Sequence, residues 1–90
     1  MRRYQERIEV EIDRRDTPVR IVWRDRTYLV ECVLDRWRWA GKWWLSGRTQ
    51  RRTYFRIEVS LASRYQLPYR PRTFEVYRKG EQWTLASVYD

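Results

Sequence analysis

The stretch RTYFRIEVSL, residues 52–61, alternates two kinds of side chain along its whole length. Its odd positions are Thr53, Phe55, Ile57, Val59 and Leu61, and its even positions include Arg52, Tyr54, Arg56 and Glu58. Because successive side chains of a β-strand point to opposite faces, this stretch predicts a strand with one face in a core and the other toward solvent.

The same two-residue period recurs on both sides of this strand. Further strands are predicted at residues 8–13, 19–24, 27–39, 73–78 and 82–89. Turn signals occur at Asp16-Thr17-Pro18, Asp25-Arg26 and Lys79-Gly80-Glu81, and residues 62–71 form the longest loop. No window keeps apolar residues at helical spacing. We therefore expect residues 1–90 to form a single all-β domain with little or no helix: a small antiparallel sheet or partly open barrel of about six to seven strands.

The strand predicted at residues 27–39 changes character in its middle. Its first even positions are the apolar Tyr28, Val30, Cys32 and Leu34, and the next two are Arg36 and Arg38. A straight strand would carry both arginines onto the core face. Either a β-bulge near residues 35–36 re-aims the chain, or the strand leaves the core there and Trp37 and Trp39 face outward. Cys32, the single cysteine, is expected to be a small buried side chain.

Positive charge is concentrated between Asp35 and Glu58. This segment holds seven cationic side chains and no acidic one, and the whole chain has a formal net charge of +8. Four of the six tryptophans lie in the same segment: Trp37, Trp39, Trp43 and Trp44. A local cationic field interleaved with aromatic rings suits a polyanion with exposed bases.

Two parts of the segment are candidate contacts for nucleic acid. Arg52, Tyr54 and Arg56 project from one strand face at a spacing of about 6.6 Å, similar to the step between nucleotides of an extended single strand. The second part is residues 36–44, where about two of the four tryptophans are expected to be buried. The predicted nucleic-acid-binding residues are Arg36, Trp37, Arg38, Trp39, Lys42, Arg48, Arg51, Arg52, Tyr54 and Arg56.

Two alternatives to nucleic-acid binding fit the same residues. A solvated arginine face over an aromatic core would produce this pattern without any ligand. Exposed Trp and Arg are also anchors of protein interfaces, so a protein-interaction or homodimerisation module is the alternative function.

The sequence argues against catalysis. It contains no histidine, which excludes histidine-based triads and metal–imidazole sites, and its three glycines form no phosphate-binding loop. Glu9, Glu11 and Asp13 share one strand face, a pattern more typical of a solvated row or of a partner for an arginine-bearing strand than of a cation site. We therefore predict no enzyme activity, no metal site and no cofactor.

A membrane location is not expected either. No apolar run approaches the roughly 20 residues needed to cross a bilayer. Met1 is followed directly by Arg2-Arg3-Tyr4 instead of a signal-peptide core. The expectation is a cytoplasmic protein without membrane attachment.

Several short motifs stand out from residue 35 onward. They are Asp35-Arg36-Trp37-Arg38-Trp39 with Trp43-Trp44, Arg52-Thr53-Tyr54-Phe55-Arg56-Ile57-Glu58, Phe74-Glu75-Val76-Tyr77-Arg78 and Trp83-Thr84-Leu85. Together they resemble a small uncharacterised bacterial β-domain that occurs alone or as the C-terminal module of inactive Y-family polymerase relatives in DNA-damage mutagenesis systems. The similarity covers about residues 35–88. The chain departs from that pattern in having no polymerase-like body and a longer loop at residues 62–71.

The resemblance implies a setting in translesion synthesis. The partners that it implies are replication or repair proteins and single-stranded or duplex DNA. It names no catalytic residue.

Overall fold

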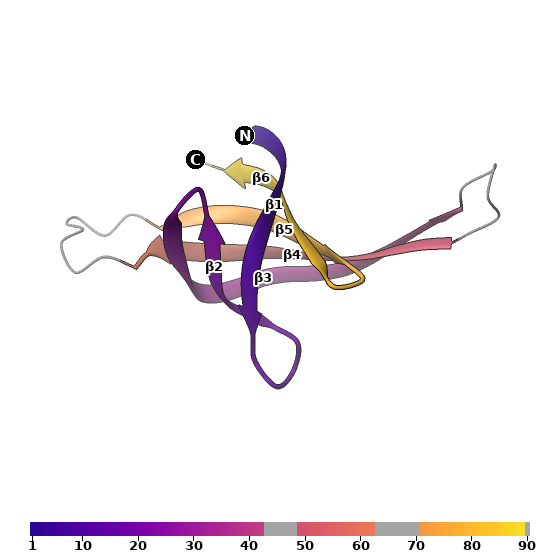
Figure 1. Ribbon diagram of the computed structural model, residues 1–90, viewed down its shortest axis with the longest axis horizontal. Coiled ribbons are helices and arrows are strands. Elements are labelled where there is room, and N and C mark those ends of the chain that lie inside the picture. Colours follow the sequence, from indigo (N-terminus) through magenta and orange to yellow (C-terminus); the bar gives the residue numbers. More distant parts are fainter. Residues whose placement is uncertain (43–48, 63–70, 90) are drawn as a thin grey trace.

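The computed structural model describes residues 1–42, 49–62 and 71–89, which form six β-strands and no helix. The strands are β1 (Arg2–Ile12), β2 (Pro18–Trp23), β3 (Arg26–Lys42), β4 (Thr49–Leu61), β5 (Arg72–Lys79) and β6 (Gln82–Tyr89). Each strand pairs antiparallel with its neighbours in sequence, and β1 also pairs with β6, so the sheet closes into a barrel (Figure 1). The all-β prediction is confirmed, and full closure is the feature that the sequence left open.

Some sequence predictions fall outside the described ranges. Trp43, Trp44, Arg48 and most of the loop predicted at residues 62–71 lie there. Within the described ranges, no helix is long and apolar enough to span a membrane.

The barrel interior is filled by aromatic and branched side chains from all six strands. They are Ile8, Ile21, Trp23, Tyr28, Phe55, Ile57, Val59, Phe74, Val76, Trp83, Leu85 and Val88. Phe74 is 0% exposed and meets Trp23 and Tyr28 edge-on, with ring centres 5.7 and 5.0 Å apart. Because a chain of this length has a small interior, a few large rings supply much of its apolar contact area. The core face predicted from residues 53–61 is confirmed at Phe55, Ile57 and Val59.

Two tight turns use left-handed backbone. Arg24 and Asp25 connect β2 to β3 with φ of 52° and 61°, the signs required by a type I′ hairpin turn. The sequence placed this turn at Asp25-Arg26, which was wrong by one residue, because Arg26 already begins β3. Gly80 turns β5 into β6 with φ of 61°, where the lack of a Cβ avoids strain.

Two β-bulges interrupt the pairing of β3 with β4. The partners are Val30 with Val59, Cys32 with Glu58, Val33 with Ile57 and Asp35 with Arg56, so β3 has one extra residue at each irregularity. Each extra residue turns the following side chains to the opposite face. Cys32 is consequently exposed beside Glu58, and the prediction that it is buried was wrong. The second bulge restores the original alternation and puts Arg36 opposite Phe55, on the inner side.

β3 and β4 extend beyond the barrel as a two-stranded arm, which leaves the other strands in Figure 1. β5 pairs with β4 from Thr53 to Val59, whereas the described residues 49–52 of β4 pair with β3 alone. We call residues 36–42 and 49–56 the arm; residues 39–42 and 49–52 form its outer part, and residues 36–38 and 53–56 form its base, where β4 is still paired with β5. The sequence left open whether a bulge or an exit from the core occurs near residues 35–36, and the structure has both: a bulge between Val33 and Asp35, and beyond it a half-buried Trp37 and a Trp39 that is 48% exposed.

Glu6 and Arg24 form a two-point ion pair between β1 and the β2–β3 turn. Arg24 Nε donates to Glu6 Oε1 at 3.0 Å, and Arg24 Nη2 donates to Oε2 at 2.7 Å. The hydrogen bond from Arg24 lowers the pKa of Glu6, and desolvation opposes this shift. A lowered folded-state pKa means that the carboxylate stabilises the protein above its unfolded pKa, and that this stability is lost as pH falls through the folded pKa.

Replacing Glu6 by Gln is therefore expected to make the free energy of unfolding less dependent on pH under acidic conditions. The wild-type free energy of unfolding should fall between about pH 5 and pH 3, partly because Glu6 becomes protonated. Glu6→Gln should be less stable at neutral pH and lose less stability over that interval. Urea unfolding at several pH values measures this. Glu9→Gln, which removes an exposed carboxylate of the same strand, should follow the wild-type profile, and a Glu6→Gln profile parallel to wild type would contradict the prediction.

Candidate nucleic-acid interface

Three aromatic rings form a row across the outer side of β3, β4 and β5. Trp37 pairs with Tyr54 and Tyr54 with Tyr77, so the three side chains share one face. The Trp37 and Tyr54 rings are stacked, with centres 5.3 Å apart and an angle of 13° between their planes. The centres of Tyr54 and Tyr77 are 5.1 Å apart. The Tyr77 hydroxyl donates a 3.0 Å hydrogen bond to Gln5 Oε1 of β1, which ties the row to the barrel.

Two guanidinium groups extend this row. Cζ of Arg52 lies 5.6 Å from the Trp39 ring centre and 4.7 Å from that of Tyr77. Cζ of Arg56 lies 5.5 Å from the ring centres of both Trp37 and Tyr89. These distances are typical of cation–π contacts. We call the set the outer stack; it comprises Trp37, Trp39, Arg52, Tyr54, Arg56, Tyr77 and Tyr89.

Several polar groups of the outer stack are buried or hydrogen-bonded to other groups of the stack and its neighbours. The Nε atoms of Arg52 and Arg56 are buried and have no hydrogen-bond partner among the described residues. Arg52 donates a 3.4 Å hydrogen bond to the Tyr54 hydroxyl, which raises the pKa of Arg52. The Tyr89 hydroxyl donates to Glu75 Oε2 at 2.8 Å, which raises the pKa of Tyr89. The rings and cations of the stack therefore stabilise one another.

The outer stack joins the two parts of the site that were predicted separately. Tyr54 and its flanking arginines share a face with Trp37 and Trp39. The sequence predicted that Arg52, Tyr54 and Arg56 form an open row. In the structure, Tyr54 has ring neighbours on β3 and β5, and both arginines lie against rings. Trp39, at 48% exposed, is the ring of the stack that is most accessible to an external base.

Tyr54→Leu is expected to lower the free energy of unfolding by about 1–3 kcal/mol, because it removes two ring pairs worth about 0.5–1.5 kcal/mol each. Trp39→Leu should cost less than about 1 kcal/mol, since half of this side chain is already in solvent. Chemical denaturation followed by circular dichroism measures both variants. Equal losses, or a Tyr54→Leu protein as stable as wild type, would contradict a structural role for the stack.

The inner side of the arm forms an arginine-lined cavity where the arm meets the barrel. Arg36 and Arg38 of β3, Arg51 of β4 and Arg78 of β5 line it, and its volume is about 310 Å³. The remaining lining residues are Thr53, Phe55, Gly80 and Asp16. Among the described residues of this lining, Asp16 is the one carboxylate. We call this cavity the arginine cradle.

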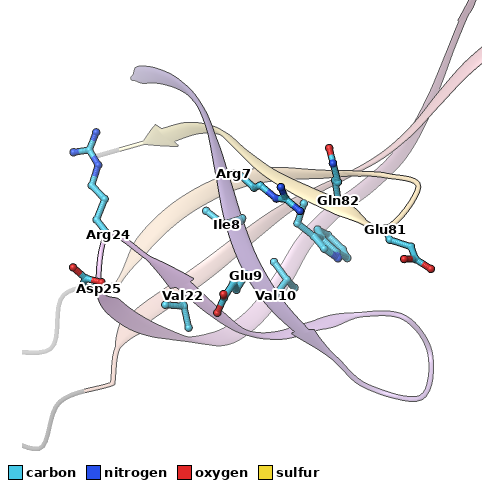
Figure 2. A pocket seen from close by; sticks show the side chains of 10 residues that line it. Arg7, Ile8, Glu9, Val10, Val22, Arg24, Asp25, Glu81 and Gln82 are labelled. Atoms are coloured by element: carbon cyan, nitrogen blue, oxygen red, sulfur yellow. The ribbon is translucent and has the colours of Figure 1, made fainter.

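A larger cavity of about 730 Å³ lies along β1. Figure 2 shows Arg24 and Asp25 at one end of it, Glu81 and Gln82 at the other, and Glu9 between them. Its charges are mixed, and Arg24 is already paired with Glu6. This cavity therefore has no concentration of one charge that would select a ligand.

Glu11 and Asp13, two of the carboxylates that the sequence singled out, have different partners in the structure. Glu11 forms a 3.7 Å ion pair with Arg20 on β2. Asp13 Oδ1 accepts hydrogen bonds from the backbone N–H groups of Arg15 and Thr17, at 2.8 and 3.0 Å, and these bonds lower the pKa of Asp13. In the part of the chain that the structure describes, no group of three acidic, His or Cys side chains is arranged to hold a metal ion.

The sheet divides eight of the ten predicted binding residues between two faces. Arg36, Arg38 and Arg51 line the cradle, and Trp37, Trp39, Arg52, Tyr54 and Arg56 belong to the outer stack. Lys42 ends β3 on the arm, and Arg48 lies outside the described residues. Sequence reasoning missed Tyr77, Arg78 and Tyr89. Their alternation predicted strands, but nothing in it indicated which residues they would face.

Comparison with known proteins gives one family. The family described as "Domain of unknown function (DUF6504)" matches residues 1–90. No curated protein and no solved structure matches the chain.

Proposed function

We propose that this chain, which belongs to the DUF6504 family, is a non-catalytic module that binds single-stranded DNA through its β3–β4 arm. The observation that carries the proposal is the charge of the arm. Seven cationic side chains lie between Asp35 and Glu58 without an acidic one, and three of them, Arg36, Arg38 and Arg51, line one cavity. Guanidinium groups arranged in this way favour phosphate oxygens.

Unpaired bases are favoured over a closed duplex because of Trp39. Its exposed ring lies beside Arg52, whose Cζ is 5.6 Å from the ring centre. Stacking of a base on an aromatic ring contributes about 1–3 kcal/mol and requires a base that has left its own stack. The arm thus combines phosphate neutralisation on its inner side with one stacking surface on its outer side.

Fluorescence anisotropy with a labelled oligonucleotide tests the proposal. Arg38→Gln/Arg51→Gln should bind about ten- to a hundredfold more weakly than wild type in low salt, because two phosphate contacts are lost. Arg7→Gln/Arg20→Gln removes the same charge away from the arm and should bind nearly as wild type does. Absence of binding by the wild type, or equal losses in the two double variants, would overturn the proposal. Tighter binding of a duplex than of the single strand would reject the choice of ligand.

The translesion-synthesis setting is part of the same proposal and rests on the motif resemblance. A role beside replication or repair proteins is compatible with the proposed non-catalytic module. The resemblance supports this context, and the arm charge supports DNA as the ligand.

Self-association is the second candidate function, favoured by apolar side chains on the surface of β3. Leu29 is 40% and Leu34 51% exposed, and such residues are suited to an interface if they form a continuous patch. The rings of Trp37 and Trp39 fit an interface less well, because each has a guanidinium at its face. Light scattering across a concentration series distinguishes a monomer from a dimer.

A further inference from the structure

The arginine cradle contains a row of three side chains that the strand register places next to one another. Arg38 of β3 pairs with Thr53 of β4, and Thr53 pairs with Arg78 of β5. Directly opposed residues on one face of an antiparallel sheet have Cβ atoms about 4.5–5.5 Å apart. A hydroxyl group therefore lies between two guanidinium-bearing side chains, and all three groups are able to donate hydrogen bonds to an anion.

Two arginines of the cradle are held in place before any ligand arrives. Arg78 Nε donates a 2.8 Å hydrogen bond to the Gly80 carbonyl, and Arg78 Nη1 lies 3.8 Å from Asp16 Oδ1. The Cζ of Arg78 is also 5.8 Å from the Trp83 ring centre. Arg36 lies over Phe55, with Cζ 5.3 Å from the ring centre. Side chains that are already ordered lose less entropy when they bind.

The position of the cradle favours binding of the end of a DNA strand over binding of its interior. Arg38 and Arg51 come from the arm, whereas Arg78 belongs to β5, Gly80 to the β5–β6 connection and Asp16 to the β1–β2 connection of the barrel. Because the arm leads away from the barrel (Figure 1), a DNA strand that lies along the arm reaches the barrel at the cradle. The terminal group of that DNA strand then lies next to Arg78.

The charge of the cradle also favours a terminal group. Four guanidinium groups and one carboxylate line the cavity. An internal phosphodiester carries one negative charge, while a phosphate monoester carries about −1.5 to −2 at neutral pH and has more free oxygens for planar guanidinium forks.

We infer that the arginine cradle binds the terminal phosphate of a DNA strand, with Arg78 and Arg38 as its principal ligands. This inference rests on the proposed function, because it names the part of the DNA that the inner face of the arm recognises. The cradle distinguishes DNA ends that carry a phosphate from DNA ends that carry a hydroxyl group.

The test compares single-stranded oligonucleotides that differ only in having a 5′-phosphate, a 3′-phosphate or hydroxyl ends. Wild type should bind one of the phosphorylated strands about tenfold more tightly than the hydroxyl strand. Arg78→Gln should reduce this preference to less than about twofold. Lys79→Gln removes the same charge from the next, exposed residue and should keep the preference. Arg78→Lys keeps the charge without the planar fork and should lose most of the preference. A thermal melt of each variant shows that it is folded.

The pH dependence provides a second readout. Arginine stays protonated over the whole range, and the chain has no histidine. A phosphate monoester loses its second charge as the pH falls through about 6. The preference for the phosphorylated strand should therefore shrink between about pH 7.5 and pH 5.5. The charged groups that face the phosphate are Arg36, Arg38, Arg51, Arg78 and Asp16. A preference that is constant with pH would contradict recognition of the dianion.

The outcomes separate this inference from the proposed function. Equal binding of all strands, with affinity that still depends on Arg38 and Arg51, overturns the cradle and leaves DNA binding by the arm intact. If no strand binds, the proposed function fails, and titration with inorganic phosphate followed by NMR of the arginine Nε–H groups tests the cradle separately. Shifts at Arg38 and Arg78 would retain it as a phosphate site, and unchanged signals would overturn it as well.

Discussion

Phe74→Ala is expected to lower the free energy of unfolding by about 3–5 kcal/mol. Phe74 is 0% exposed and contacts Trp23 and Tyr28 edge-on, so truncation removes a large apolar ring and two aromatic pairs at once. Proteins have about 0.05–0.15 kcal/mol of stability per residue, and for a chain of this length the loss is a large share of the total. The melting temperature should fall by about 15–30 °C.

Urea unfolding followed by circular dichroism measures this loss. Leu29→Ala is the matched control, because it also truncates an apolar strand residue but one that is 40% exposed; it should cost less than about 1 kcal/mol. Phe74→Leu should fall between them and keeps the comparison measurable if the alanine variant does not fold. A loss below about 1 kcal/mol for Phe74→Ala would contradict its position at the centre of the core.

The affinity for single-stranded DNA is expected to fall about a hundredfold between about 50 and 200 mM salt. If about five of the seven cations between Asp35 and Glu58 neutralise phosphates, the slope of log K against log salt is about −3.5. Non-electrostatic stacking on Trp39 is insensitive to salt and sets the affinity that remains. Fluorescence anisotropy over a salt series gives the slope directly.

The double variant of the cradle provides the internal check on this slope. Arg38→Gln/Arg51→Gln should make the slope less negative by about 1.4, since each lost phosphate contact contributes about 0.7. Arg7→Gln/Arg20→Gln should leave it unchanged. Binding that ignores salt would mean that the arm cations do not contact phosphate, and it would remove the basis of the proposed function.

The described cations between Asp35 and Glu58 have unequal roles in the structure. Arg52 and Arg56 lie against aromatic rings and stabilise the outer stack. Arg36, Arg38 and Arg51 open toward the cradle on the inner side. A count of charges along the sequence gives all seven cations the same weight, whereas packing divides these five into a structural group and a group that faces a cavity.

Much of the fold follows from local patterns. The alternation at residues 53–61 correctly identified Phe55, Ile57 and Val59 as core, because the period of a strand is a property of its own backbone. The same reasoning failed at Cys32, since the first bulge depends on how two strands fit together and the apolar residues around Cys32 give no sign of it. The hairpin turn at Arg24 and Asp25 was missed by one residue for a related reason. Both residues adopt positive φ without the glycine that usually marks such a turn.

For the candidate site, too, some features follow from the sequence and others from the tertiary structure. The sequence by itself determined that the segment between Asp35 and Glu58 is basic and rich in tryptophan, that its strands alternate, and that Arg52, Tyr54 and Arg56 share a face. Tertiary structure decided that Tyr77 packs against Tyr54 and that Thr53 of β4 lies between Arg38 of β3 and Arg78 of β5. The physical reason is that alternation arises within a strand, whereas register arises between strands. Two bulges in β3 and the closure of the barrel set that register, and so they determine which rings and guanidinium groups meet.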